Sequence, residues 1–565
     1  MSLNAALGIA SRSLEIFTAG IQVAGQNIAN ANTPGYIREK LILDPAQPYQ
    51  RGGQIYGTGV YATGIVQQID LFLETRIHTA NADLSASEAR ETIYLQLEEQ
   101  IRELGEEDLS TSLNNFLATI NDLVNQPEST STRQLAIQQG TQLANDISSL
   151  RLRIDELRKS QTVKVDQLVD EANSLIRQID DLNPKISKME SSGLGGSDAG
   201  ALRTLRYKAL SRLSEIVPIT FREREDGGVD VFTGSDFLIL TGSIQQLETY
   251  KSDNRDVLVQ NVRLSKTGSE LSVASGGELK GIVDGRDQIL GKFVDDLDAF
   301  AGSIINAFNT IYASGQGLDG FTTLSAVAQV DDPTAELDTI GLGLTPVNGT
   351  FEIKVKNKVS GTTVTTTIPV DLDGIGTDTS LNTLRAAIDA VGNISASISN
   401  NGTLRIDADP NFEFSFANDN SNILAGLGLN TFFTGRDSGN IGINQVVAGN
   451  PRLFAASLGG GPSDGRNAVK LAQFADQALS ALGNVSIDDF YDTMVSQVGQ
   501  KASAETAISE SFKSFRESLE NQRQQFSGVS IDEEAVKVLE FQRAFQASAR
   551  IVSTVDELFR VLLEM

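Results

Sequence analysis

The residue types that most often carry catalysis or bind metals are almost missing from this chain. Its 565 residues include no cysteine and a single histidine, His78. Without cysteine the chain has no disulfide, no thiolate nucleophile and no cysteine-based zinc site, and one histidine cannot make a histidine metal cluster. His78 stands on a predicted helix among polar neighbours, so we interpret it as a surface or packing residue. This composition therefore disfavours most catalytic chemistry.

Two other sequence patterns could bind a ligand in principle. The glycine pairs at 374–376 and 426–428 lack the third glycine and the strand–turn–helix context of a dinucleotide site, so we interpret them as turns. The segment 371–374, Asp-Leu-Asp-Gly, starts like a calcium loop, but no acidic residue stands at the twelfth position that an EF-hand requires. We therefore expect no catalytic residue, no cofactor and no metal site, and we expect that the protein is not an enzyme.

The composition of the chain limits the kinds of molecule that it can bind and the cellular compartments in which it can be found. Asp and Glu total 73 against 46 Lys and Arg, and the resulting net charge of −27 argues against nucleic acid or an anionic membrane surface as main partner. The N-terminus has no positive charge before Arg12 and so lacks the basic flank of a secretory signal peptide. No apolar run is long enough for a membrane helix. We expect a soluble protein that is cytoplasmic or is exported with its N-terminus intact.

Both ends of the chain predict long helices with apolar residues three and four positions apart, the pattern of a coiled-coil seam. In the first helix these residues are Leu3, Leu7, Ala10, Leu14, Phe17, Ile21, Ala24, Ile28 and Ala31. In the last helix they are Val538, Phe541, Phe545, Ser548, Val552, Val555, Phe559 and Leu562. Pro34 and Gly35 must end the first helix in a type II turn, and Gly528 marks the break before the last. Small residues on the first seam and phenylalanines on the last favour packing of one helix on the other. The alternative is that each helix docks on its own domain.

Between the ends, helical and β-type patterns occupy separate stretches. Helices are predicted from about 88 to 183. One helix from about 129 would span roughly 80 Å before Pro184 stops it. Short β-type runs with glycine and aspartate turns follow over 229–273, and a helix returns over about 278–312.

A β-rich block near 335–450 interrupts the helices. It alternates β-type runs with hairpin signals and contains one helix at 380–391, after which helical patterns resume from about 467 to the end. Along the sequence, the helices at the two ends therefore flank further helical segments, and these flank a β-rich insert. Such a chain folds back on itself with its termini together, and we predict an elongated α+β subunit built to stack.

Signature sequences stand at the two ends. The segment GQNIANANTPGYIREKLILD, with its core at 27–36, closely resembles the N-terminal signature of bacterial flagellar axial proteins, which are the rod, hook and hook-associated proteins. The segment from Phe541, FQRAFQASARIVSTVDELFRVLLEM, resembles the C-terminal signature of the same family. Within the family the chain is most similar to the hook-associated proteins at the hook–filament junction. That similarity rests on the length, on Arg38, on the segment 276–287 with its GGEL and Arg-Asp motifs, and on the block from Ile423.

The resemblance implies an axial protein with an α+β fold and several domains along its length. The expected domains are a terminal coiled-coil (inner core) domain at 1–36 and 529–565, a helix-rich, helical-bundle middle domain at 37–330 and 451–528 with a β-hairpin segment near 216–275, and a β-rich outer insert domain at 331–450. The expected assembly interface on the terminal helices comprises Leu3, Leu7, Leu14, Phe17, Ile21, Ile28, Val538, Phe541, Phe545, Val552, Val555, Phe559 and Leu562. The signature turn comprises Asn30, Asn32, Thr33, Pro34, Gly35 and Tyr36.

The resemblance also implies the partners. These would be further copies of the chain in a ring, the hook protein, the next hook-associated protein on the filament side, and a dedicated export chaperone near residues 525–565. The subunit would leave the cell through the flagellar type III system without a cleaved signal and act outside it. No nucleic acid, membrane insertion or cofactor is implied.

Three alternatives stay open. The chain could be another flagellar axial protein, although flagellin lacks the NTPGY turn and the helix-rich region before Pro184 disfavours rod and hook proteins. It could be a secreted adhesin or antigen that acts through the insert at 331–450. An enzyme built on an axial scaffold is disfavoured by the missing cysteine, the lone histidine and the absence of nucleotide motifs.

Overall fold

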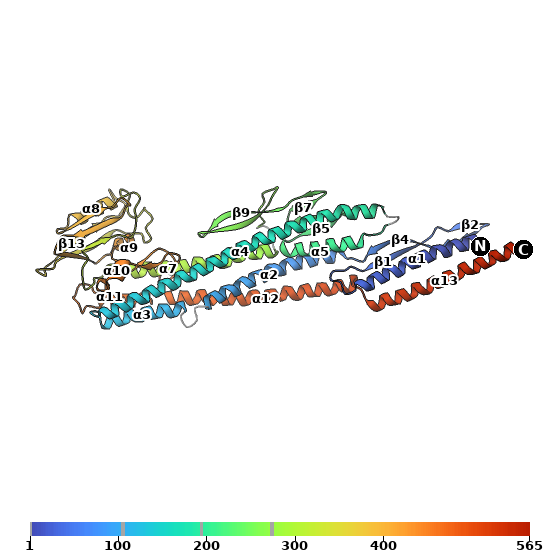
Figure 1. The fold of residues 1–565 in the computed structure, drawn as a ribbon. Helices are drawn as coiled ribbons and strands as arrows, with labels where there is room; N and C mark the ends of the chain where they lie inside the picture. The colour runs from blue at the N-terminus through green and yellow to red at the C-terminus, as the bar shows by residue number, and fades with distance from the viewer. Residues whose placement is uncertain (1–2, 103–107, 193–195, 272–275, 565) are drawn as a thin grey trace. The chain divides into compact units, whose positions relative to one another are not determined.

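The computed structural model describes residues 3–102, 108–192, 196–271 and 276–564. The chain divides into two compact units, which we call unit 1 (residues 1–93, 159–288 and 502–565) and unit 2 (residues 94–158 and 289–501). Both units receive residues from the long helices α2 (Leu71–Arg102), α4 (Thr130–Ser192) and α12 (Ile487–Ser527), which are drawn in Figure 1. The domain boundaries expected from the sequence stay a prediction, because the two units divide these helices.

Unit 1 contains the two terminal helices, α1 (Leu3–Asn30) and α13 (Ile531–Glu564). Four strands follow α1, and they form two antiparallel pairs, β1 (Glu39–Pro45) with β4 (Val60–Gln67) and β2 (Tyr49–Arg51) with β3 (Gln54–Tyr56). After α5 (Gly200–Ile216) comes an antiparallel sheet of β5 (Thr220–Glu223), β6 (Val229–Thr233), β7 (Asp236–Leu240) and β8 (Ser243–Ile244), then the hairpin β9 (Leu247–Asn254) with β10 (Val257–Leu264). The β-type runs predicted within 229–271 are thereby confirmed; residues 272 and 273 lie outside the described residues.

The core of unit 1 lies between α4, α5, the β5–β8 sheet and α6 (Glu278–Asp284). Ile176, Leu213 and Val231 are completely buried there. A Cβ on Gly281 would lie 2.4 Å from the carbonyl oxygen of Ala86, so α6 can approach α2 this closely only with a glycine at that position. The glycine-rich segment before Arg286 therefore has a packing role.

Pro184 does not end α4, contrary to the sequence prediction, because the helix continues to Ser192. Pro184 is exposed, so water can bind the backbone carbonyl that loses its N–H partner. Leu182 and Ile186 on either side of the proline are buried in one apolar cluster with Ala199. Their packing outweighs the cost of an internal proline, which is about 3 kcal/mol in an isolated helix.

Unit 2 has a helical part built around stacked aromatic rings. It contains α3 (Leu109–Asn125), α7 (Gly291–Ala313), which follows the π-helical turn η3 (Gly285–Leu290), and α11 (Arg466–Ala472). The ring centroid of Phe308 lies 5.3 Å from those of Phe116, Phe432, Phe433 and Phe474. Such ring pairs add attraction beyond the area they bury, so this cluster joins segments distant in sequence.

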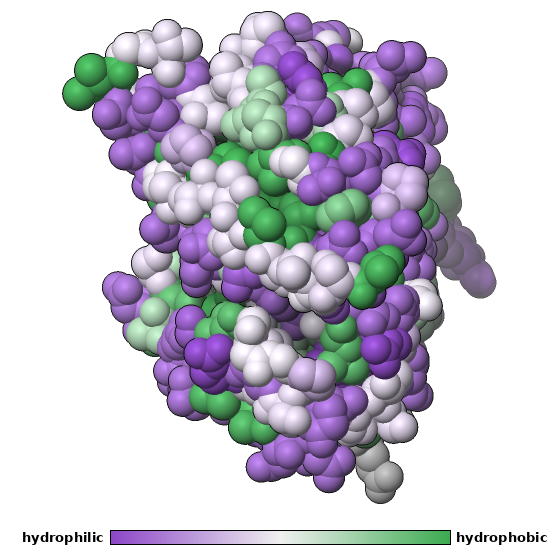
Figure 2. Space-filling view, turned by 90° about the vertical axis from the view of Figure 1, so that its left-hand side faces the viewer, coloured by the Kyte–Doolittle hydropathy of each residue, from purple (hydrophilic) through white to green (hydrophobic). Residues whose placement is uncertain are grey.

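The β-rich part of unit 2 consists of two three-stranded antiparallel sheets with one helix. The strands are β12 (Gly349–Asn357), β13 (Thr363–Val370) and β16 (Phe412–Ala417) in one sheet, and β11 (Thr323–Ser325), β14 (Ile394–Ile398) and β15 (Leu404–Ala408) in the other; α8 (Leu381–Asp389) lies between β13 and β14 in sequence. The β-rich block and the helix near 380–391 are thus confirmed. On the face shown in Figure 2, hydrophilic residues cover most of the surface and hydrophobic ones gather near the middle of its upper half.

Short elements complete unit 2. They are α9 (Ile423–Leu427), the strand pair β17 (Phe433–Thr434) with β18 (Gly442–Ile443), α10 (Gln445–Gly449), η4 (Pro451–Leu453) and η5 (Ser480–Leu482). The mixed α+β class predicted from the sequence is confirmed. None of the helices in the described residues is long and apolar enough to cross a membrane.

His78 is a buried packing residue of α2. It is 1% exposed, its ring centroid lies 5.3 Å from that of Phe221, and neither ring nitrogen has a hydrogen-bond partner among the described residues. Burial and, to a smaller extent, the positive charge of Arg523 on α12 together lower the pKa of His78 to about 4. Burial raises the pKa of the neighbouring Glu74 carboxyl to about 6, an effect that Arg523 partly opposes.

We predict that His78→Leu removes an acid sensitivity of unit 1. Because the pKa of His78 is lower in the folded chain than its ordinary value of about 6.5, the unfolded chain binds the proton first, and stability falls as the pH drops from 6.5 towards 4. At pH 5 the penalty is about 2 kcal/mol. The free energy of unfolding of the variant, measured with urea at pH 7.5 and 5, should therefore rise relative to the native chain by about this amount between the two values. Glu74 is present in both chains, and its opposite effect cancels in this comparison. An unchanged difference between the two pH values would contradict the prediction.

Candidate assembly interface

The terminal helices α1 and α13 pack side by side and antiparallel in unit 1 (Figure 1). The ring centroids of Phe17 and Phe541 lie 6.4 Å apart. Closer to the C-terminal end of α1, Asn27 donates a hydrogen bond to Glu534. A Cβ on Gly20 would lie 2.8 Å from three ring atoms of Phe541, so the absence of a side chain makes room for the phenylalanine. A large ring thus packs against the smallest residue of the partner helix.

The predicted interface residues lie along this pair with different degrees of burial. Val555 is buried, Phe545 and Leu562 are exposed, and the others are half-buried, namely Leu3, Leu7, Leu14, Phe17, Ile21, Ile28, Val538, Phe541, Val552 and Phe559. That they contact a second copy stays a prediction. Apart from Val555, these side chains are at most half-buried in the single chain, so part of each stays available to a neighbour.

The fully buried stripe of α1 coincides only in part with the predicted seam. Ala10 and Ala24 are buried and belong to that seam, whereas the other buried residues, Ile16, Gly20, Val23 and Asn27, do not. This difference arises because strands β1 and β4, as well as α13, pack against α1. Gly59, just before β4, approaches Ile9 so closely that a Cβ would lie 3.1 Å from its Cγ2.

Asn27 is the centre of the polar contacts between these elements. Its side chain is completely buried and makes four hydrogen bonds. The amide nitrogen donates to the Glu39 carbonyl oxygen at 2.8 Å and to Oε2 of Glu534 at 2.9 Å. The amide oxygen accepts from the Tyr36 hydroxyl and from the Glu39 N–H, both at 3.0 Å. One residue therefore joins α1, the signature turn, β1 and α13.

Glu534 places a carboxylate inside this contact. It is 1% exposed, and its Oε1 accepts from Nε and Nη2 of Arg38 at 2.9 and 2.6 Å and from Nζ of Lys537 at 2.9 Å. Burial alone would raise the pKa of Glu534, but the hydrogen bonds from Asn27, Lys537 and Arg38 outweigh it and hold the pKa below its usual range. The neighbouring Glu533 also pairs with Arg38, at 2.8 Å, yet its side chain is 63% exposed.

The signature turn has the geometry that its residues predict. Gly35 has φ of 76°, and the Tyr36 N–H donates to the Thr33 carbonyl oxygen at 3.1 Å, which confirms the type II turn. The break at Gly528 is confirmed as well, because α12 ends at Ser527 and α13 begins at Ile531. The Arg38 N–H donates to the Ser527 carbonyl oxygen at 3.0 Å. A hollow of about 520 Å³ lies between the turn, residues 30–38, and the α12–α13 junction, residues 523–533.

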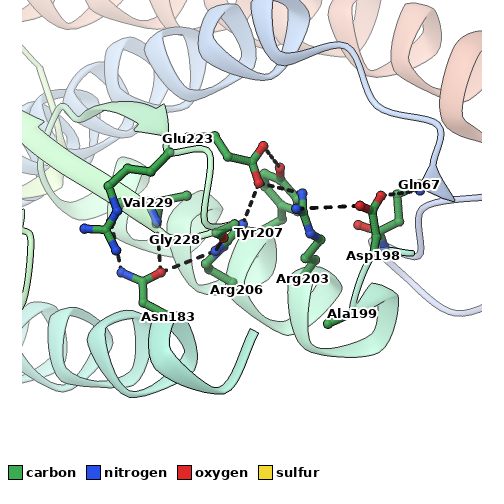
Figure 3. Close-up of polar contacts among 12 residues, drawn as sticks. Gln67, Asn183, Asp198, Ala199, Arg203, Arg206, Tyr207, Glu223, Gly228 and Val229 are labelled. Atoms are coloured by element: carbon green, nitrogen blue, oxygen red, sulfur yellow. Dashed lines mark hydrogen bonds and ion pairs between the residues drawn. The ribbon is translucent and has the colours of Figure 1, made fainter. Parts of the chain in front are cut away.

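A cluster around Arg203 fixes the β1–β4 strands to the body of unit 1 (Figure 3). The Gln67 N–H, at the end of β4, donates to Asp198 at 2.7 Å, and Asp198 faces Arg203 at 3.6 Å. Arg203 also donates to Glu190 at 2.6 Å and to Glu223 at 2.5 Å. Burial would lower the pKa of Arg203, but these carboxylates raise it above its usual value.

A second arginine extends the same cluster. Arg206 is completely buried and donates to the Gly227 carbonyl oxygen at 2.5 Å and to Glu223 at 3.1 Å. Asn183 of α4 accepts from Arg206 at 3.3 Å and exchanges two hydrogen bonds with the backbone of Val229 (Figure 3). Because β4 is fixed here and pairs with β1, Glu39 of β1 is held where Asn27 binds it.

Sequence reasoning missed the polar centre of this interface. Asn27 and Arg38 were noticed only as parts of a signature, and Glu534 was not singled out. Asn27 and Glu534 are 507 positions apart, so no local pattern connects them. The available signal was an asparagine inside an apolar helix, because such a residue is buried only where its amide finds partners.

We predict that Glu534→Gln loosens the terminal helix pair and that Glu533→Gln does not. Neutralising the buried carboxylate leaves Arg38 without its charged partner, which should cost about 1–3 kcal/mol. The exposed Glu533 should contribute less than about 1 kcal/mol. Amide hydrogen exchange in α1 and α13 at neutral pH should therefore become roughly 5- to 150-fold faster in Glu534→Gln only.

The same carboxylate predicts the direction of the pH dependence. Because the pKa of Glu534 is lowered by folding, its contribution is complete above the ordinary glutamate pKa and is lost as the pH falls through the lowered value. Equal exchange in the native chain and in Glu534→Gln would show that the carboxylate does not stabilise the pair.

The comparisons with known proteins match this chain to flagellar components. Residues 94–325 match the family model of the flagellar hook-associated protein FlgK helical domain, and residues 520–565 match that of the C-terminal part of the flagellar basal body rod FlgEFG proteins. The second match contains the C-terminal signature from Phe541.

Similar proteins are matched over almost their whole length. Flagellar hook-associated protein 1 of Escherichia coli (strain K12) is 23% identical over 572 residues, and that of Salmonella typhimurium is 25% identical over 587 residues; each match covers 100% of both chains. The protein of that name from Bacillus subtilis (strain 168) is 22% identical, with 98% of this chain and 96% of the relative covered.

A solved structure shows a similar fold. The flagellar hook junction protein FlgK from Burkholderia pseudomallei aligns with a TM-score of 0.50 and 16% identity, over 81% of this chain and 100% of that chain. The helical-domain model, the C-terminal model that contains the second signature, and the full-length relatives show that this chain is similar to the flagellar hook-associated protein FlgK family, and they support a structural role on the flagellar axis.

Proposed function

We propose that this chain is the structural subunit that joins the hook to the filament. Copies would form a ring, with the hook protein on one side and the next hook-associated protein on the filament side. Among the positions along the flagellar axis, this one is supported by the solved relative, which is named a hook junction protein. The proposed role needs no catalytic residue, no cofactor, no nucleic acid and no membrane insertion.

The observation that supports the proposed polymerisation is the exposed apolar surface of α13. One side of this helix meets α1, while other apolar side chains along it are exposed in the single chain, namely Val536, Leu539, Ile551, Leu558, Val561, Leu562 and Leu563. Removing apolar surface from water stabilises an assembly by about 25 cal/mol per Å². Neighbouring copies that cover this surface would therefore bind one another through the terminal helices.

Assembly and folding of the ends would be coupled. Gly8, Gly20 and Gly25 weaken α1 as an isolated helix, each by about 1 kcal/mol against alanine. The run 551–555 in α13, rich in β-branched residues, also disfavours a lone helix. Ordering both ends costs conformational entropy that contacts with neighbours offset, so premature polymerisation is discouraged.

The same surface suits a protein that is exported before it assembles. An export chaperone that covers residues near 525–565 would shield the exposed apolar side chains of α13 in the cytoplasm. The chain would then pass through the flagellar type III system and act outside the cell. A chaperone complex that survives deletion of this tail would contradict this part of the proposal.

Deleting the gene in the source bacterium tests the position on the axis. We expect electron microscopy to show bare hooks, and we expect flagellin to be lost into the culture medium, because filament subunits would have no junction to start from. Normal filaments, or missing hooks, would assign the chain to another part of the flagellum.

Charge placed on the uncovered face of α13 tests the polymerisation. Leu558 is 48% exposed, so Leu558→Asp should leave the single chain folded but place a charge where a neighbour packs. In the deletion strain we expect this variant to be secreted and to fail to restore filaments. Gln546→Asp, at an exposed polar position of the same helix, should restore them. Full motility with Leu558→Asp would show that this face does not contact a neighbouring copy.

A further inference from the structure

Three carboxylates converge in the loop between β13 and α8 of unit 2. Asp371, Asp373 and Asp378 each bring one oxygen to within 4.8 Å of an oxygen of each of the others. Asp371 and Asp373 are exposed, and Asp378 is 6% exposed. None of the ion pairs in the described part of the chain joins a lysine or arginine to these three residues. Their mutual repulsion is therefore not balanced by a basic side chain there.

Asp378 carries a buried oxygen without a partner. Its Oδ2 accepts from the Gly374 N–H at 3.1 Å, whereas Oδ1 is inaccessible to solvent and has no hydrogen bond to any described residue. Leaving one oxygen of a carboxylate both out of water and without a donor is costly. A cation among the three carboxylates would supply the missing partner. This oxygen is a separate observation from the clustering of acidic residues, and it indicates a bound ion.

The loop is held in shape by its own backbone. The Asp371 N–H donates to Oγ1 of Thr379 at 2.8 Å, and the Thr379 N–H donates to the Asp371 carbonyl oxygen at 2.7 Å, so the two ends of the loop are joined. Gly374 and Gly376 have φ of 72° and 91°, which lets the chain curl between the acidic residues. The carboxylates are thus brought together before any ion binds, which lowers the entropy cost of binding.

The chemistry of the group favours calcium. All three side chains offer oxygen, the ligand of hard cations, and calcium takes six to eight oxygens at about 2.3–2.6 Å with flexible geometry. Oxygens of the three carboxylates lie within 4.8 Å of one another, a separation that the ligands of one calcium ion can span.

We propose that Asp371, Asp373 and Asp378 bind one calcium ion. The site is not an EF-hand, since Asp378 closes it at the eighth position from Asp371. Carbonyl oxygens of the loop and water would complete the coordination. Bound calcium would satisfy Oδ1 of Asp378 and neutralise the charge that the three carboxylates gather between β13 and α8. We expect a dissociation constant on the order of 10⁻⁴–10⁻³ M, the range of extracellular calcium modules.

Calcium titration of the full-length chain tests the site. The protein is freed of divalent ions and titrated with calcium chloride in a calorimeter, with potassium chloride in excess to suppress nonspecific binding to the acidic surface. We expect one saturable site in the native chain and at least tenfold weaker binding in Asp373→Asn. Asp373 is exposed, and asparagine keeps an oxygen that can accept from the Ile375 N–H, so this variant should fold. Asp378→Asn should abolish the site.

A matched variant and a second measurement make the outcome decisive. Asp338→Asn removes an exposed carboxylate outside the cluster in the same β-rich part and should bind like the native chain. The melting temperature should rise with calcium in the native chain and in Asp338→Asn, and it should not rise in Asp373→Asn. Equal calcium binding by the native chain and Asp373→Asn would overturn the proposal. Magnesium binding as tight as calcium binding would overturn the assignment of the ion.

Discussion

A carboxylate buried between two apolar helices is the constraint on which the terminal region depends. Glu534 is almost inaccessible to water, and an ionised group in that position is stable only where donors replace the water it has lost. Asn27 supplies one donor from α1 and Arg38 supplies two from beyond the signature turn. A shift of α13 by one turn would separate the carboxylate from both, so the helices have a single satisfied register.

Polar and apolar contacts have different roles in this helix pair, and the difference matters for assembly. Apolar packing such as Phe541 against Gly20 supplies attraction but tolerates sliding, whereas the contacts of Asn27 have fixed geometry. Arg203 does the same for the strands that cover α1, by holding Asp198 and, through it, Gln67. Because the inner face of α13 is fixed by these contacts, its exposed apolar side chains are presented in one orientation. The ring that we propose requires this, since every copy in it would offer the same surface to its neighbour.

Local patterns predicted the elements, whereas long-range contacts decided which side chains they bury. The turn at Gly35, the break at Gly528 and the strands of the β-rich block depend on residues close in sequence, and they were predicted correctly. The buried stripe of α1 was predicted only at Ala10 and Ala24, because strands β1 and β4 cover a second side of the helix. The continuation of α4 through Pro184 has the same origin, since packing with Ala199 outweighs a local breaker. The partnership of Asn27 with Glu534 depends on contact between the two ends of the chain.

The use of arginine explains why so acidic a chain can also leave carboxylates without basic partners. Several arginines are fully buried and bind backbone carbonyl groups: Arg133 donates to the carbonyl oxygens of Pro127 and Phe454, and Arg286 to that of Gln260. Burial lowers the pKa of Arg133 to about 10, which leaves it charged at neutral pH. These guanidinium groups join segments of the core, and Arg286 also pairs with Asp287 at 2.7 Å, so the acidic residues, 73 against 46 basic ones, remain in excess elsewhere in the chain. Acidic residues that converge in a loop under these conditions lower their repulsion by binding a cation from solution.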